Sequence, residues 1–269
     1  MAGNVVMVTG AGRGIGAGVA RLLHQRGARL VLIDIDDAGL LDLASELGED
    51  TVLCIGCDVT DFDGMQAAVT AAVERFGGID VVVANAGIEQ WAPVRTVEPR
   101  DFRRVIDTNV IGVFNTVRAA LPSMIERRGY VLVVGSVSSY TALPGMASYA
   151  ASKAGAEQFA NVLRMELSAY GVGVGSAQMS LVDTPMLRET LSRAIGFVKL
   201  IAALPAPMRR PVTVDTCAAR LVDAIDNRRR YVDVPRWVAA ARWLKPLLST
   251  PPAQWPMLRQ MKRIESGVQ

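Results

Sequence analysis

The sequence predicts a doubly wound α/β fold, in which helices cover both faces of a parallel sheet. Short apolar runs alternate with longer segments of helical periodicity along most of the chain, a pattern typical of parallel strands joined by crossover helices. Several of these runs end in Gly, Asp, Asn or Ser, and open α/β sheets bind ligands at the carboxyl ends of their strands. The 269 residues are 51% hydrophobic, which is sufficient for one sizeable core.

The first half of the chain repeats the order strand, helix, strand. The expected elements are a strand at Asn4–Val8, a helix after a glycine-rich turn, a strand at 28–34, a helix at Asp36–Leu47, a strand at Thr51–Gly56, a helix ending at Phe76 and a strand that breaks at Asn85. Right-handed crossovers bring the carboxyl ends of such strands to one edge of the sheet. We therefore expect Gly10, Asp34, Asp58, Asn85 and Ser136 to lie along that edge.

The second half continues the pattern and adds a long helix. The run YVLVVG predicts a buried strand that ends just before Ser136, and GVGVGSAQ predicts another strand. Between them, the segment from Ser148 onward, SYAASKAGAEQFANVLRMEL, predicts a helix. VTVDTCAARLVDAIDNRRR predicts a helix that packs on the sheet, and YVDVP predicts the final edge strand.

Composition and charge exclude several classes of protein. The net charge of +3 comes without the clustered Lys and Arg of nucleic-acid-binding proteins, so we expect no nucleic-acid partner. Three cysteines indicate a reducing compartment, and we interpret Cys54 and Cys57 as core thiols of a strand. We find no signal peptide at MAGN, no apolar run of the roughly 20 residues that span a membrane, and no set of metal ligands. We expect a cytoplasmic protein that needs no metal.

The glycine-rich segment TGAGRGIG is a candidate phosphate site. It lies between a predicted strand and a predicted helix, with Gly10, Gly14 and Gly16 in the spacing GxxxGxG. Glycines let the backbone approach a pyrophosphate, and the helix N-terminus offers unpaired N–H groups and partial positive charge. The alternative is an ordinary tight turn between a strand and a helix.

Asp34 favours a dinucleotide at this turn. It ends the second predicted strand, 18 residues after Gly16, near the spacing at which an acidic residue binds the adenosine ribose. A carboxylate there accepts a hydrogen bond from the 2′-hydroxyl and repels a 2′-phosphate. Arg13 has the opposite tendency, because a guanidinium in the glycine loop can hold a phosphate. We expect Asp34 to dominate, so that NAD(H) is preferred over NADP(H).

A second cluster, Ser136, Tyr149 and Lys153, is a candidate proton-transfer site. Tyr149 and Lys153 are four residues apart, so a helix places them on one face, one turn apart. A fixed cation beside a phenol favours the phenolate, and we expect Lys153 to lower the pKa of Tyr149. Ser136 follows a predicted strand and would supply a third group. The alternative is that the Tyr and Lys belong only to an amphipathic surface.

Together these residues resemble the short-chain dehydrogenase/reductase family in type, order and spacing. The matching segments are TGAGRGIG, Asp34, Asp58-Val59, ANAG, Asn109 within DTNVIGVFNT, Ser136 and YAASK, over roughly residues 4 to 190. The resemblance implies a Rossmann-type doubly wound sheet of about seven strands flanked by helices. It also implies hydride transfer between a nicotinamide and a secondary alcohol or ketone.

The resemblance implies roles in cofactor binding, residue by residue. At the adenosine end, the pyrophosphate would be wrapped by Gly10, Arg13, Ile15 and Gly16, the ribose would be bound by Asp34, and the adenine would lie between Asp58 and Val59. The middle of the cofactor would be lined by Asn85, Ala86 and Gly87. At the nicotinamide end, the carboxamide would be held by Val182 and Thr184, and further contacts would come from Tyr149 and Lys153. Met179-Ser180 stands where the family usually has Pro-Gly, so the resemblance does not determine the path of the backbone beside the nicotinamide.

The resemblance also implies four catalytic residues. Ser136 would polarise the substrate oxygen, Tyr149 would act as general acid/base, and Lys153 would lower the pKa of Tyr149 while holding the nicotinamide ribose. Asn109 would position a water in a proton relay. The alternative for Asn109 is that it lies inside a helix and that its side-chain amide forms hydrogen bonds only with solvent.

The last third of the chain carries the substrate loop and an extension. Residues 185–211 occupy the position of the family's substrate-binding loop and are rich in apolar side chains, which predicts an apolar alcohol or ketone. We divide the chain into a dehydrogenase/reductase domain at 1–235 and a helical extension at 236–269 that is not an independent domain. Within it Trp237, Ala241, Leu244 and Leu248 form an apolar stripe, with Arg242 and Lys245 off the stripe.

Two interpretations of the extension remain open. The stripe packs over the substrate loop or against a partner subunit, or tryptophans and basic side chains hold the extension at a membrane surface. Family members commonly pair through the helices that follow Asn109 and Tyr149, so we expect a homodimer or homotetramer. The function expected overall is an NAD(H)-dependent alcohol/ketone oxidoreductase. The alternative is a non-catalytic NAD(H)-binding sensor or scaffold.

Overall fold

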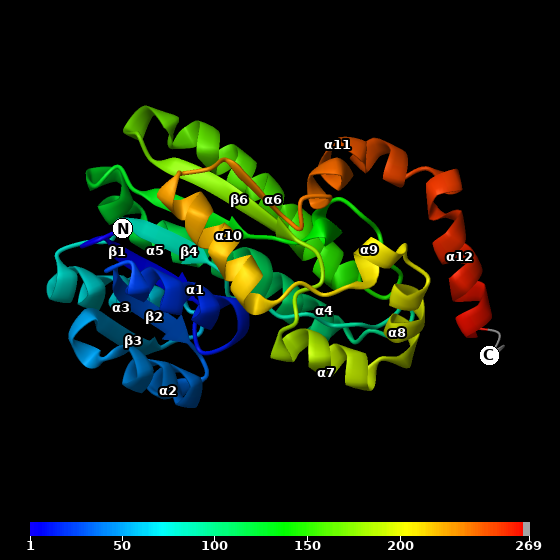
Figure 1. Ribbon diagram of the computed structural model, residues 1–269, viewed down its shortest axis with the longest axis horizontal. Helices are drawn as coiled ribbons and strands as arrows, with labels where there is room; N and C mark the ends of the chain where they lie inside the picture. Colours follow the sequence, from blue (N-terminus) through cyan, green and yellow to red (C-terminus); the bar gives the residue numbers. More distant parts are fainter. Residues whose placement is uncertain (266–269) are drawn as a thin grey trace.

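The computed structural model describes residues 1–265 and contains a seven-stranded parallel sheet (Figure 1). Its strand order is β3-β2-β1-β4-β5-β6-β7. The strands are β1 (Val5–Thr9), β2 (Arg29–Asp34), β3 (Val52–Gly56), β4 (Val81–Ala84), β5 (Tyr130–Val134), β6 (Gly173–Met179) and β7 (Tyr231–Val234). The order reverses between β1 and β4, the position at which such sheets bind ligands. The predicted doubly wound sheet of about seven strands is confirmed.

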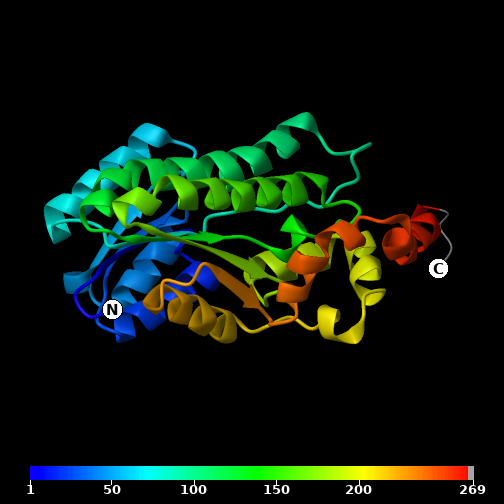
Figure 2. The same ribbon diagram turned by 90° about the horizontal axis from the view of Figure 1, so that it is seen from above.

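Helices cover both faces of the sheet, as the two sides of Figure 2 show. One face is covered by α1 (Gly14–Gln25), α2 (Asp37–Leu47) and α10 (Val214–Asp226), and the other by α3 (Phe62–Phe76), α5 (Gly112–Glu126) and α6 (Ala147–Glu166). Helix α4 (Pro99–Ile106) and a π-helical turn (Asp107–Ile111) lead into α5. Short 3₁₀ turns lie at Glu49–Thr51, Val137–Ser139 and Ser168–Tyr170.

The sheet separates two apolar cores because successive side chains of a strand point to opposite faces. In β1, Val6 and Val8 pack beneath α1, whereas Val5 and Met7 pack beneath α3 and α5. All of β1 is buried, which explains why its sequence is continuously apolar.

The expected element boundaries hold to within one or two residues in the first half of the chain. Helices α2 and α3 begin after Asp36 and Asp61, whose side chains accept hydrogen bonds from the first-turn N–H groups of Gly39 and Gly64. The interpretation of both CxxC cysteines as buried core thiols is wrong. Cys54 is half-buried in β3, and Cys57 lies beyond the end of that strand, because this strand is at the edge of the sheet.

The expected substrate loop consists of three short helices. They are α7 (Pro185–Arg193), α8 (Ile195–Ala202) and α9 (Ala206–Arg209). The C-terminal extension forms α11 (Val238–Leu248) and α12 (Pro251–Glu265), and its last residues, 266–269, lie outside the described residues. No helix within residues 1–265 is long and apolar enough to cross a membrane.

The predicted apolar stripe of α11 is only partly covered. Ala241 is buried and Trp237 is half-buried, but Leu244 is 44% exposed. Arg242, expected off the stripe, instead faces the protein: its Nη2 lies 2.8 Å from Asp233 Oδ2, and its guanidinium lies 4.2 Å from the centre of the Tyr231 ring. An ion pair with the edge strand therefore determines which side of α11 faces the sheet.

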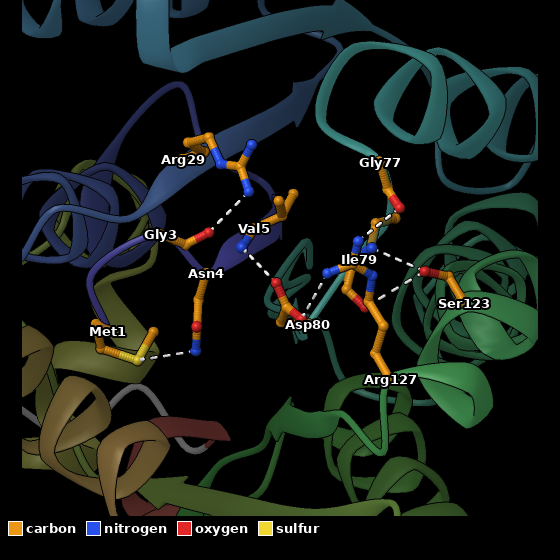
Figure 3. A network of polar contacts seen from close by, with 10 residues as sticks. All are labelled: Met1, Gly3, Asn4, Val5, Arg29, Gly77, Ile79, Asp80, Ser123 and Arg127. Carbon is orange, nitrogen blue, oxygen red and sulfur yellow. Dashed lines mark hydrogen bonds and ion pairs between the residues drawn. The ribbon is translucent and has the colours of Figure 1, made fainter.

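A polar network closes the edge of the sheet opposite the strand carboxyl ends (Figure 3). Asp80, just before β4, accepts a hydrogen bond from the backbone N–H of Val5 at 2.8 Å and pairs with Arg127 at 3.1 Å. Arg127 also donates to the carbonyl of Gly77, and Ser123 accepts from the N–H of Ile79 at 2.7 Å. The starts of β1 and β4 are thus tied to the end of α5.

Replacing Asp80 by Ala is expected to destabilise the fold by about 1–3 kcal/mol, because it leaves the strand N–H of Val5 without its acceptor and removes the ion pair with Arg127. The urea unfolding midpoint of Asp80→Ala measures this loss. Glu74→Ala, on the exposed side of α3, is the matched control and should change the midpoint little. Equal midpoints for the two variants would contradict a stabilising role for the network.

Candidate active site

The glycine loop between β1 and α1 is shaped by close backbone contacts. Gly10 has a φ of +65°, in the left-handed region that favours glycine. A Cβ on Gly16 would overlap the carbonyl oxygen of Gly10, so only glycine fits there. Arg13, at the N-cap of α1, is exposed and its side chain makes no capping hydrogen bond. The first turn of α1 therefore keeps N–H groups available for an anionic ligand.

Asp34 lies beside this loop, at the end of β2. Its Oδ2 accepts a hydrogen bond from the N–H of Gly12 at 2.8 Å, and its Oδ1 accepts from the N–H of Asp36 at 3.1 Å. Each carboxylate oxygen has a second lone pair for a ligand hydroxyl. A tight glycine turn, an uncapped helix N-terminus and an adjacent carboxylate fit the pyrophosphate and ribose of a dinucleotide.

The loop after β4 is bound directly to the glycine loop. The Asn85 side chain donates to the carbonyls of Thr9 at 2.9 Å and Gly10 at 3.0 Å. In turn, the Thr9 hydroxyl accepts from the N–H groups of Asn85 and Ala86 at 3.1 and 3.2 Å. The amide of Asn85 thus positions the loop rather than pointing at a ligand. Sequence reasoning missed Thr9, although it directly precedes Gly10.

Asp58 and Val59 lie after β3 in different surroundings. Asp58 is exposed and accepts from the N–H of Thr60 at 2.8 Å. The Val59 side chain is only 5% exposed and packs so closely on α5 that a Cβ on Gly112 would overlap it. Asn115 donates to the Val59 carbonyl at 2.9 Å. The side chain of Val59 therefore belongs to the core, whereas Asp58 remains at the surface of the site.

The segment after β6 returns to the glycine loop. Ser180 donates its backbone N–H to Val234 of β7 at 2.8 Å, and Val182 is buried and bridged to Val212. Thr184 caps α7, and its methyl group lies 3.5 Å from the position of a Cβ on Gly14. The backbone after Met179 thus follows the edge strand and places Thr184 beside the start of α1. Ile15, also on α1, is half-buried against the core.

Helix α6 brings the expected proton-transfer residues together. Lys153 Nζ donates to the carbonyl of Val134 at 3.0 Å and lies 5.7 Å from the centre of the Tyr149 ring. The Ser136 side chain, just after β5, lies close enough to the Tyr149 phenol to lower its pKa by hydrogen bonding. A Cβ on Gly87 would lie 3.3 Å from Lys153 Nζ, so the loop after β4 forms the facing wall. Ser136 and Lys153 are buried and Tyr149 is half-buried, so the three residues form one cluster largely removed from water.

The pKa of Tyr149 differs from the expectation. Burial raises the pKa of the phenol above its ordinary value, the Glu89 carboxylate raises it further, and the hydrogen bond with Ser136 lowers it. Burial also lowers the pKa of Lys153 to about 8, against an opposing effect of Glu89. The net direction is thus opposite to the expected lowering, because desolvation of the phenol and the charge of Glu89 dominate. The contribution expected of Lys153 stays a prediction.

Asn109 is part of this wall rather than a solvent-exposed helix residue. It is fully buried in the π-helical turn before α5. Its side chain accepts from the N–H of Ile88 and donates to the Ile88 carbonyl, both at 2.9 Å. It also donates to Ser152, whose hydroxyl donates to the carbonyl of Tyr149 at 2.8 Å. Asn109 thus positions the loop after β4 and the helix that carries Tyr149. The sequence analysis did not identify Ser152, although it lies within YAASK.

Glu89 is a second residue that sequence reasoning missed. It lies in the loop after β4 and accepts a hydrogen bond from Thr190 of α7. Burial raises the pKa of Glu89, and Thr190 and Lys153 lower it. Its position immediately after ANAGI was the available signal, but the pairing with Thr190 depends on how the substrate loop folds over the site.

Trp91, in the same loop, contacts both sides of the substrate region. A Cβ on Gly145, ahead of α6, or on Gly196, in α8, would overlap the Trp91 indole. The indole belongs to an apolar cluster that includes Tyr149, Met146, Leu187 and Phe197. Glu89 and Trp91 therefore connect the substrate loop to the loop after β4.

A comparison with protein families identifies the chain. Residues 4–194 match the model of the family described as short chain dehydrogenase. The chain belongs to the short-chain dehydrogenase family. The extent of the match agrees with the resemblance expected over roughly residues 4 to 190.

Known members of the short-chain dehydrogenase family support an enzymatic role. The trans-4-hydroxycyclohexanecarboxylate dehydrogenase of Sinomonas cyclohexanicum is 34% identical over 74% of this chain and 80% of its own length. Oxidoreductase UcpA of Salmonella typhimurium is 39% identical over 72% of this chain and 74% of its own length. The structure of a 3-ketoacyl-(acyl-carrier-protein) reductase from Brucella melitensis complexed with NADH is similar, with a TM-score of 0.78 and 30% identity over 87% of this chain and 97% of that one. This short-chain dehydrogenase is an oxidoreductase that acts on CH–OH groups with a nicotinamide cofactor.

Proposed function

We propose that the protein interconverts a secondary alcohol and a ketone on a neutral, apolar substrate, with Tyr149 as the general acid/base. The observation that carries the proposal is the cluster of Ser136, half-buried Tyr149 and Lys153 at the carboxyl edge of the sheet. This arrangement favours catalysis over the alternative of a sensor or scaffold, because such a protein needs no acid/base pair shielded from water. Bound nicotinamide supplies or accepts the hydride.

The residues of the chain handle the proton. Ser136 is placed to donate a hydrogen bond to the substrate oxygen, which stabilises the negative charge that develops there. Tyr149 gives its phenolic proton to that oxygen in ketone reduction and takes it back in alcohol oxidation. Lys153, held by the Val134 carbonyl, keeps a cation near the phenolate. Asn109 and Ser152 fix the helix and loop that carry these groups.

The surroundings of Tyr149 support an apolar, uncharged substrate. The buried cluster of Met146, Leu187, Ala194 and Phe197 packs with Tyr149 and Trp91, so a hydrocarbon portion of the substrate would be desolvated there. Glu89 lies close enough to affect both Tyr149 and Lys153. An acidic side chain beside Tyr149 is unfavourable for an anionic substrate, and we infer that neutral cyclic ketones are used better than carboxylated ones.

We also propose that the chain divides into a domain at 1–235 and an extension at 236–269. In addition, we propose that the protein forms a homodimer or homotetramer. Ile111 and Phe114 are each 44% exposed at the start of α5, and Met165 is exposed on α6. These apolar surfaces support pairing through α5 and α6. A cytoplasmic location is proposed on the cysteine content of the sequence.

Replacing Tyr149 by Phe should reduce turnover by roughly 10²-fold or more, because it removes the general acid while keeping the ring. The assay is oxidation of NADH with cyclohexanone, larger hydrophobic ketones and a carboxylated cyclohexanone. Tyr170→Phe, which alters an exposed tyrosine, is the control. A Tyr149→Phe rate within a few-fold of the unmodified protein would refute the assignment.

Replacing Asp34 by Asn or Ala should narrow the preference for NADH over NADPH by about ten-fold or more, because the charge that repels a 2′-phosphate is lost. Asp34→Asn keeps an acceptor for the N–H of Gly12, so it separates charge from loop structure. Calorimetric titrations with both cofactors measure the ratio. Tighter binding of NADPH by the unmodified protein would show that Arg13 outweighs Asp34.

Replacing Glu89 by Gln should shift the pH dependence of alcohol oxidation to lower pH. The Glu89 carboxylate raises the pKa of Tyr149, and oxidation needs the phenolate, so a neutral residue lets the phenolate form at lower pH. Profiles of kcat/KM against pH test this, with Glu98→Gln on the exposed N-cap of α4 as the control. An unchanged profile, or a shift to higher pH, would contradict the role of Glu89.

A further inference from the structure

Helices α11 and α12 carry an exposed surface that combines tryptophan, leucine and basic side chains. We call this surface the outer C-terminal face, and it consists of Trp243, Leu247, Trp255, Leu258, Arg259 and Lys262. Trp243 is 80% exposed, Leu247 61%, Trp255 54% and Leu258 50%. Isolated exposed leucines are ordinary, but two tryptophans and two leucines on adjoining helices form an apolar patch that needs a partner.

The inner sides of both helices are already occupied. Helix α11 packs on β7 through buried Val238 and Ala241, and the ion pair of Arg242 with Asp233 fixes its rotation. Helix α12 contacts α8, where Gln260 lies within 3.5 Å of the Lys199 carbonyl. Lys245, four residues after Ala241, also extends toward the protein, with its Nζ 5.9 Å from the centre of the Tyr140 ring. The side chains of the outer C-terminal face lie on the opposite sides of the two helices.

The spacing on α12 makes its outer side one continuous stripe. Trp255, Leu258, Arg259 and Lys262 follow the pattern i, i+3, i+4, i+7, which places them on one face of a helix. Gln254, Met257 and Gln260, which alternate with them, are half-buried. The Arg259 guanidinium lies 4.2 Å from the centre of the Trp255 ring, so the apolar and basic groups lie side by side.

The charge of this region is of one sign. Between residues 236 and 262 the sequence has no Asp or Glu, and its basic residues are Arg236, Arg242, Lys245, Arg259 and Lys262. Arg242 is paired inside the protein. The other basic side chains are exposed and have no acidic partner within their own segment. The partner of the outer C-terminal face should therefore carry negative charge.

A second copy of the chain fits this face poorly. In a two-fold contact each surface meets the same surface of the other copy, which brings Arg259 and Lys262 toward their own counterparts. Such a contact buries like charges that have no acidic neighbours to pair with. An anionic lipid surface instead accepts both kinds of side chain, because tryptophan rings lie at the headgroup level and Arg and Lys reach the phosphates.

We propose that the protein binds the surface of anionic lipid bilayers through the outer C-terminal face. The helices would lie on the surface rather than cross it, with Trp243, Leu247, Trp255 and Leu258 entering the headgroup region and Arg259 and Lys262 binding lipid phosphates. Figures 1 and 2 both show α11 and α12 at one end of the molecule, and α12 packs on α8 of the substrate loop. Bilayer contact therefore adjoins the loop that covers Tyr149.

Vesicle co-sedimentation of the full chain tests the proposal. The probes are vesicles of phosphatidylcholine alone and of phosphatidylcholine with phosphatidylglycerol, at low and high salt. We expect binding to the anionic vesicles that falls about ten-fold or more at high salt, and little binding to the neutral ones. Tryptophan emission should shift to shorter wavelength on binding, and W243F/W255F should abolish most of that shift.

Two surface variants separate the apolar and the electrostatic contributions to vesicle binding. Replacing Trp243, Leu247, Trp255 and Leu258 by Gln should weaken binding about ten-fold or more, as should replacing Arg259 and Lys262 by Gln. The matched control replaces Leu41 and Tyr170, which are 67% and 53% exposed elsewhere, by Gln. Circular dichroism and NADH binding check that each variant is folded.

Several outcomes would overturn the proposal. Negligible binding of the unmodified protein to anionic vesicles would do so, as would binding that neither surface variant reduces. If the apolar variant instead changes the oligomeric state measured by light scattering while vesicle binding is absent, the face is a contact between subunits.

Discussion

The nucleotide half of the site depends on a contact between two pieces of backbone, at Gly10 and Gly16. Their separation leaves no room for a Cβ on Gly16, and this closeness lets the chain turn sharply from β1 into α1. The Asn85 amide donates to the carbonyl of the same turn, so the loop after β4 is fixed by it as well. Asp34 completes the arrangement from β2. Three neighbouring strands thus present their loops as one preformed surface.

The proposed catalytic half depends on burial, which acts in two directions. Removing Tyr149 and Lys153 from water raises the pKa of one and lowers the pKa of the other, so each group is driven toward its neutral form. Tyr149 therefore holds its phenolic proton more firmly, whereas Lys153 releases its ammonium proton more readily than an exposed lysine does. Glu89 adds a negative charge to the same enclosure and favours the protonated phenol. The apolar cluster around Tyr149 makes each of these electrostatic effects stronger, because it excludes solvent.

The sequence predicted what depends on local spacing. The parallel sheet follows from alternating periodicities, and the proximity of Tyr149 and Lys153 follows from one turn of helix. Pairings between distant segments could not be predicted in this way: Glu89 with Thr190, and Arg242 with Asp233, are joined by the packing of the substrate loop and of α11. The direction of the pKa change at Tyr149 was missed for the same reason. Sequence shows that a lysine is near, whereas desolvation depends on side chains from many elements.

The position of Trp91 between two glycines has an evolutionary consequence. Its indole fills the space that a side chain at Gly145 or Gly196 would need, so the backbones on either side contact the ring itself. Exchange of Trp91 for a smaller residue would open room that a side chain at Gly196 can fill by a single mutation, whereas Gly145 has a φ of +82° that disfavours any other residue. The shape of the substrate region can therefore change through paired substitutions at Trp91 and Gly196, while Ser136, Tyr149 and Lys153 stay where they are. New substrate ranges would arise around an unchanged proton-transfer site.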